Sequence, residues 1–150
     1  MTNSKESREI LIGRQGEGRI AFGAPSPILD GSGYVRLPFR VEIDGLSASN
    51  TIDLEDWGGG VDGLIAYFAG MAESWRGWPA AMDWHDDGGQ IRMSAAHDGK
   101  GTVALSVFVY QDVRGDSPGS WTLRAVLALD PGSLQGYVMA LRAHLDQRLG

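Results

Sequence analysis

The sequence predicts an α+β fold, with a twisted antiparallel β-sheet and two amphipathic helices packed on one face. Segments in which apolar and polar residues alternate, the pattern of half-buried strands, occur in two groups. Each group is followed by a segment whose apolar residues recur every three or four positions, the period of a helix. Because strands in runs with helices after them favour helices on one side of an antiparallel sheet, we expect four strands, a helix, four strands and a helix. No convincing sequence repeat relates the two halves.

The first group of strands precedes residue 56. Short apolar segments at 10–12 and 20–22 indicate two of them, and the clearest strand spans 34–43. Because proline cannot donate a ladder hydrogen bond, Pro38 predicts that this strand lies at a sheet edge or is bulged there. The segment 49–54 is expected to return alongside it after a hairpin turn.

The first helix is expected to follow the glycine run 58–60. Glycine is common just beyond a helix and proline ends one firmly, so Gly77 and Pro79 predict where it stops. Its apolar stripe is Val61, Leu64, Ile65, Phe68, Ala72 and Trp75.

The second group of strands is expected at 82–84, 91–96, 103–109 and 121–129. The last helix should begin near Asp130-Pro131, a good N-cap followed by a good first residue. Its apolar stripe is Leu134, Tyr137, Val138, Leu141, Leu145 and Leu149. We expect His144 to be exposed beside this stripe. The residues predicted to be buried are Leu64, Phe68, Trp75, Val103, Leu105, Leu127, Leu141 and Leu145.

Length and composition bound the class of protein. At 150 residues, 43% of them hydrophobic, we expect a disordered tail at 1–8 and a single α+β domain at 9–150. The chain has no cysteine, which excludes disulfides and thiol chemistry, and its start does not resemble a signal peptide. We expect a cytoplasmic protein without membrane contact. The net charge of −6 predicts no direct binding of nucleic acid, because phosphate affinity comes mainly from Lys and Arg.

Three tryptophans lie within ten residues, in Trp75-Arg76-Gly77-Trp78 and at Trp84. Trp75 ends the first helical stripe, so we expect it in the core. Trp78 follows the helix-ending glycine and leaves the helical register, which leaves core packing and a partly exposed platform equally open. Arg76 lies between them and could cover an indole face.

Several segments together resemble a small uncharacterised bacterial family that is common in actinobacteria. They are the helix ending in Trp75-Arg76-Gly77-Trp78, the strand connection 96–101, and the segment 127–132 before the last helix. The resemblance covers roughly residues 35–149. It implies no activity and no catalytic residues, and in size and architecture it is loosely like small immunity-type proteins.

Candidate chemistry is sparse. Asp83, His85, Asp86 and Asp87 form an acidic cluster that could bind a divalent metal, but a solvated hairpin turn is the preferred interpretation, so we expect no metal and no cofactor. The pair His97-Asp98 could act as acid and base, although Asp98-Gly99 suits a turn by itself. The glycine run 58–60 lacks the lysine and serine of a phosphate-binding loop.

We therefore expect a non-enzymatic cytoplasmic protein that acts through a protein partner. The acidic net charge would suit a basic partner, and the most concrete version of this role is immunity or toxin neutralisation. The expected partner-binding residues are Arg76, Trp78, Asp86 and Asp87, because arginine and tryptophan concentrate binding energy at interfaces. One alternative is a small-ligand or metal-dependent enzyme using the acidic segment Asp83–Asp87. A second is an acidic inhibitor that occupies the nucleic-acid-binding groove of a partner. The oligomeric state stays open.

Overall fold

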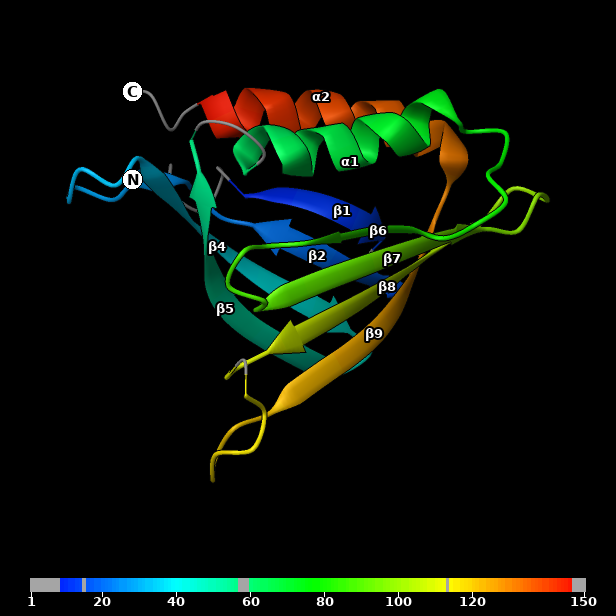
Figure 1. The fold of residues 1–150 in the computed structure, drawn as a ribbon. Helices are drawn as coiled ribbons and strands as arrows, with labels where there is room; N and C mark the ends of the chain where they lie inside the picture. The colour runs from blue at the N-terminus through cyan, green and yellow to red at the C-terminus, as the bar shows by residue number, and fades with distance from the viewer. Residues whose placement is uncertain (1–8, 15, 57–59, 113, 147–150) are drawn as a thin grey trace, which may run out of the picture.

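The computed structural model describes residues 9–14, 16–56, 60–112 and 114–146, in which two antiparallel sheets are capped at one end by two α-helices (Figure 1). The first sheet contains β1 (Ile10–Arg14), β2 (Gly18–Phe22), β3 (Ser26–Pro27), β4 (Tyr34–Ile43) and β5 (Leu46–Glu55). The second contains β6 (Met82–His85), β7 (Ile91–His97), β8 (Val103–Tyr110) and β9 (Thr122–Leu129) in sequence order. The helices are α1 (Val61–Glu73) and α2 (Leu134–Leu145), the latter preceded by a short 3-10 turn, Pro131–Ser133.

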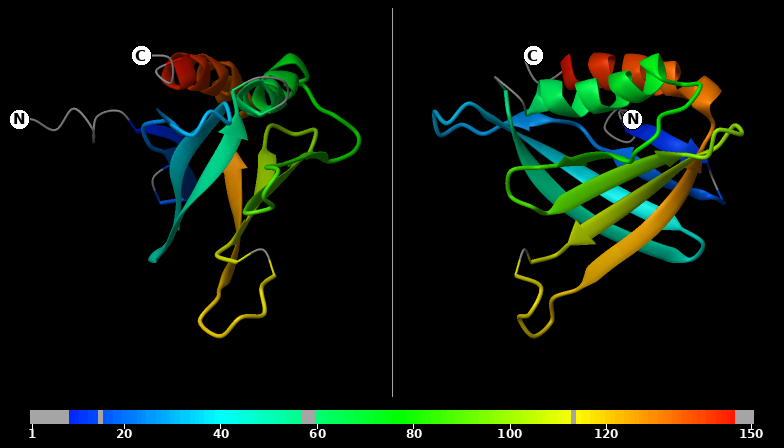
Figure 2. Two further views of the ribbon diagram at one scale, coloured as in Figure 1. Left: turned by 60° about the vertical axis from the view of Figure 1, so that its left-hand side comes forward. Right: turned by 45° about the vertical axis from the view of Figure 1, so that its right-hand side comes forward.

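The predicted α+β class is confirmed. The order of elements matches the expected one except that the first group contains a fifth strand, the two-residue β3, and the strands form two sheets. The strands of the two sheets run in crossing directions, and α1 and α2 lie side by side across their upper end (Figures 1 and 2). None of the helices in the described part of the chain has the length and apolar character that a bilayer crossing requires. The expected tail at 1–8, most of the glycine run 58–60 and Leu149 lie outside the described residues.

The hairpin of β4 and β5 is the longest paired element. It turns at Asp44-Gly45, where both residues have positive φ (32° and 79°), as the preferred two-residue hairpin turns require. Of the two alternatives for Pro38, the sheet edge is wrong, because β4 is paired on both sides. The pairing is irregular at Pro38 instead, because residues 23–25 lie opposite only Leu37 and Pro38. Pro38 lies where the neighbour changes from β2 to β3, and its carbonyl accepts a hydrogen bond from the Gly23 N–H (2.8 Å). The missing N–H of Pro38 therefore costs no ladder hydrogen bond where β2 gives way to β3.

The hydrophobic core lies between the inner faces of the sheets and under the helices. Seven of the eight residues predicted to be buried are buried. Strand β2 meets β9 of the other sheet at Gly18, where a Cβ would collide with the Leu127 side chain. The φ of 93° favours glycine at position 18, and any Cβ there would also force the Leu127 side chain to move.

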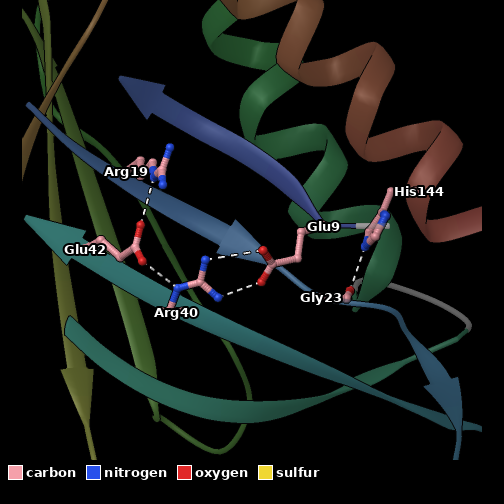
Figure 3. A network of polar contacts seen from close by, with 6 residues as sticks. All are labelled: Glu9, Arg19, Gly23, Arg40, Glu42 and His144. Carbon is pink, nitrogen blue, oxygen red and sulfur yellow. Dashed lines mark hydrogen bonds and ion pairs between the residues drawn. The ribbon is translucent and has the colours of Figure 1, made fainter. Parts of the chain in front are cut away.

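Two burial predictions are wrong. Trp75 is 48% exposed, because α1 ends at Glu73 and the helical stripe does not continue to position 75. His144 is only 3% exposed: its Nε2 donates a hydrogen bond to the Gly23 carbonyl (2.6 Å), which joins α2 to the end of β2 (Figure 3). A buried imidazole is tolerated when its ring N–H has such a partner.

Candidate functional site

The outer face of the second sheet carries a row of polar and aromatic side chains that crosses all four strands. In the strand register, residues that lie directly opposite one another are His85 on β6, Arg92 on β7, Phe108 on β8 and Arg124 on β9. Their neighbours along β7, β8 and β9 point inward and are buried, so the members of the row point outward. Arg92, Arg124 and His85 are exposed and Phe108 is half-buried.

The two arginines lie over aromatic rings. The Arg124 guanidinium carbon is 5.6 Å from the centre of the Phe108 ring, and that of Arg92 is 5.8 Å from the centre of the Tyr110 ring. Tyr110 lies two residues beyond Phe108 on β8 and therefore shares its face. The result is a patch of two rings and two cations on adjacent strands, which we call the aromatic–arginine face.

The outward-facing arginines of the two sheets differ in their ion pairing. On the first sheet, Arg19 and Arg40 both bind Glu42, each at 2.8 Å, and Arg40 also binds Glu9 at 2.6 Å (Figure 3). Hydrogen bonds from Arg19 and Arg40 lower the pKa of Glu42, and those carboxylates raise the pKa of Arg40. Each guanidinium of this network is therefore neutralised by a carboxylate.

On the second sheet, neither Arg92 nor Arg124 forms an ion pair with any residue in the described ranges. Their contacts with Tyr110 and Phe108 leave the guanidinium charge uncompensated. Although the chain as a whole is acidic, this face presents two cations that can pair with an anionic ligand.

A hollow of about 450 Å³ opens on the aromatic–arginine face, which is within the size range of ligand pockets. It is lined by Asp83, Trp84, His85, Arg92, Met93, Ser94, Phe108 and Tyr110. The rings of Phe108 and Tyr110 come from β8 and the carboxylate of Asp83 comes from β6, with β7 between them. The hollow thus combines two aromatic rings, the Arg92 cation and the Asp83 anion.

The acidic cluster of the β6–β7 turn is built by the backbone. Asp86 is 2% exposed, and its Oδ1 accepts the Ile91 N–H (2.9 Å), which closes the turn. Its Oδ2 is buried without a hydrogen-bond partner in the described residues. Exposed Asp87 lies against Glu55 of β5 and raises the pKa of that carboxyl. Across the described ranges, no three His, Asp or Glu side chains are placed to hold a metal ion.

The four residues predicted to bind a partner divide between the two ends of the β6–β7 hairpin. Trp78 is 8% exposed and its Nε1–H donates to the Ala95 carbonyl (2.9 Å), so of the two open alternatives the structure has core packing. Arg76 is exposed, with its guanidinium 5.0 Å from the centre of the Trp75 ring. Asp86 and Asp87 lie at the opposite end, beside Ile91. The structure therefore does not bring the two pairs together.

His97 and Asp98 each support a turn. The His97 Nε2 donates to the Trp75 carbonyl (2.8 Å) and its Nδ1 accepts the Gly99 N–H (2.8 Å). Asp98 Oδ1 accepts the N–H groups of Lys100 and Thr102, which lower the pKa of its carboxyl. These contacts account for the motif as loop geometry, the interpretation that the sequence favoured.

Sequence reasoning missed the aromatic–arginine face. None of its four members, Arg92, Phe108, Tyr110 and Arg124, was singled out. The available signal was an aromatic or arginine residue at outward positions of three successive predicted strands. Strand register, which aligns them, is a tertiary property that the alternation of one strand does not contain.

A family model matches residues 28–148, and the chain belongs to that family, described as a family of unknown function (DUF6228). No curated protein matches the chain. Among solved structures, the chain is similar to "the plant transcriptional regulator PBF-2", with a TM-score of 0.45 and 16% identity over 95% of this chain and 82% of that one. It is also similar to WHY1 from Arabidopsis thaliana, with a TM-score of 0.43 and 15% identity over 95% of this chain and 85% of that one.

These likenesses correct the expected class of function. A transcriptional regulator among the similar structures does not agree with an immunity-type protein that acts through a protein partner and makes no direct contact with nucleic acid. That expectation is wrong, and its two alternatives, the enzyme at Asp83–Asp87 and the acidic groove inhibitor, are not kept. At this level of similarity, neither solved structure assigns a ligand or a residue role to this chain.

Proposed function

We propose that this protein binds single-stranded nucleic acid on the aromatic–arginine face of the second sheet. The observation that carries the proposal is the row in which His85, Arg92, Phe108 and Arg124 lie side by side across four strands. Single strands are bound by aromatic side chains that stack with unpaired bases and by cations that follow the phosphates. This face supplies both: Phe108, Tyr110 and Arg92 line one hollow, and Arg124 lies over the Phe108 ring from β9.

The spacing of the two rings suits successive nucleotides. Phe108 and Tyr110 are two residues apart on one strand, which separates them by about 7 Å. Paired bases in a duplex expose no ring face for stacking, so the two rings favour unpaired strands. Arg92 and Arg124 flank β8 on both sides, where either can leave its ring contact to bind a phosphate. The proposed role is binding, with no catalytic step.

Fluorescence anisotropy with a labelled 15-nucleotide thymine strand tests the proposal. Substitutions Phe108→Ala and Tyr110→Ala should each weaken binding about tenfold, because stacking contributes about 1–3 kcal/mol per base. Tyr34→Ala is the matched control: it removes an aromatic side chain from the first residue of β4, on the other sheet, and should leave affinity unchanged. An unlabelled duplex of equal length should compete poorly.

Two results would contradict the proposal. One is failure of the wild-type protein to bind the strand at about 100 µM in low salt, the weak end of non-specific nucleic-acid binding. The other is binding that neither Phe108→Ala nor Tyr110→Ala changes. Circular dichroism of each variant shows whether the sheet is intact, because both rings point away from the core.

A further inference from the structure

The hollow of the aromatic–arginine face has two chemically different walls. On one side stand the rings of Phe108 and Tyr110, and on the other stands the carboxylate of Asp83. The Asp83 side chain is exposed and forms no ion pair with any residue in the described ranges. A carboxylate accepts hydrogen bonds through two oxygens and donates none. It can therefore receive two neighbouring donors from a ligand.

Charge orients a strand in this hollow. Asp83 on the edge strand β6 repels phosphates, and Arg124 on the opposite edge strand β9 attracts them. The sugar–phosphate backbone is then placed over β8 and β9. The edges of bases that stack on the rings point towards β6, where His85 lies opposite Phe108 in the strand register and Asp83 lies two residues along the same face.

The four common bases differ in what they offer to a carboxylate. The Watson–Crick edge of guanine carries two adjacent donors, N1–H and the 2-amino group, which match the two carboxylate oxygens. Adenine and cytosine offer one amino group beside an acceptor nitrogen, and thymine or uracil offers one N–H between two carbonyl oxygens. An acceptor placed against Asp83 is repelled, so these edges fit less well.

From these walls we infer that the hollow selects guanine, with Asp83 as the residue that determines base preference. This inference rests on the proposed function, because it assigns the base that the same face reads.

Seven-nucleotide thymine strands with a variable central base test the inference by fluorescence anisotropy. We expect the strand with central guanine to bind about tenfold tighter than the all-thymine strand, the discrimination typical of a two-donor contact with a base. Hypoxanthine, which keeps N1–H but lacks the 2-amino group, should fall between them. Adenine and cytosine should resemble thymine.

Asp83→Asn tests the contribution of the carboxylate while leaving the rest of the aromatic–arginine face unchanged. It should bring the guanine strand to within about threefold of the thymine strand, without weakening the thymine strand. Asp44→Asn is the matched control, because it removes one negative charge from the exposed β4–β5 turn, where asparagine tolerates the positive φ of 32°. This control should keep the guanine preference.

The outcomes distinguish the inference from the function on which it rests. Equal affinity of wild-type protein for all central bases overturns the guanine assignment and leaves single-strand binding standing. A guanine preference that survives Asp83→Asn overturns the role of Asp83. Failure of every strand to bind overturns the proposed function, and the guanine assignment with it.

Discussion

Substitution of Arg124 by alanine should reduce the salt dependence of nucleic-acid binding by a calculable amount. Each phosphate of a single strand that a cation neutralises contributes about 0.7 to the slope of log K against log salt. Two unpaired arginines, Arg92 and Arg124, lie on the aromatic–arginine face, so together they contribute about 1.4. Between 50 and 200 mM salt, this slope weakens wild-type binding about sevenfold, and Arg124→Ala should reduce that factor to about 2.6.

Anisotropy titrations of a labelled thymine strand at four salt concentrations measure the slope. Arg124→Lys keeps the charge and should keep the slope, which separates phosphate pairing from contact with the Phe108 ring. Arg36→Ala on the first sheet should leave the slope unchanged, because that guanidinium is already paired with Asp53 (Nε to Oδ1, 3.0 Å). A slope unchanged in the double variant Arg92→Ala/Arg124→Ala would refute the reasoning.

Three further predictions concern stability. Leu105→Ala should lower the free energy of unfolding by about 2–5 kcal/mol in urea denaturation, because Leu105 is fully buried in the core; a loss below about 1 kcal/mol would contradict this. Trp78→Phe should lower the free energy of unfolding by about 1–3 kcal/mol, because the Ala95 carbonyl loses its indole donor. Thermal melting measures this loss, and a variant as stable as wild type would contradict the prediction. Because the pKa of Glu42 is lowered in the folded state by Arg19 and Arg40, its stabilising effect is present above the unfolded pKa and is lost as the pH falls through the lower folded pKa. Unfolding followed from pH 6 to pH 2 should therefore show a smaller loss of stability for Glu42→Gln than for wild type, and identical pH profiles would argue against this effect.

Local periodicity was enough to predict the helices and the strands other than the two-residue β3. Residues 34–42 of β4 and all eight residues of β8 alternate between buried and less buried positions, as their sequences indicate. Periodicity could not show that the strands divide into two sheets, because a strand has the same alternation of apolar and polar residues in one sheet as in two. Nor could it place His144, whose burial depends on a carbonyl 121 residues away at Gly23.

The tryptophan motif shows the limit of reasoning from residue type. Tryptophan and arginine concentrate at interfaces, but tryptophan is also a large core side chain that needs one hydrogen-bond acceptor. At Trp78 that acceptor is the Ala95 carbonyl, a partner supplied by β7 after the chain folds. Trp75 differs by three positions and lies exposed, because α1 has already ended. The choice between core and surface was decided by the helix end and the sheet together.

Net charge misled the sequence interpretation for a physical reason. Charges on a protein surface act over about 10 Å at 0.1 M salt, so a ligand responds to the local arrangement and not to the sum of −6. On the first sheet Glu9 and Glu42 neutralise the arginines, whereas Arg92 and Arg124 on the second sheet face aromatic rings. Asp83 on the edge strand β6 repels phosphate locally. It therefore orients a nucleic-acid strand on a face that remains cationic over β7 to β9. An acidic protein can bind a polyanion in this way, provided that its carboxylates are paired or lie where the base edges belong.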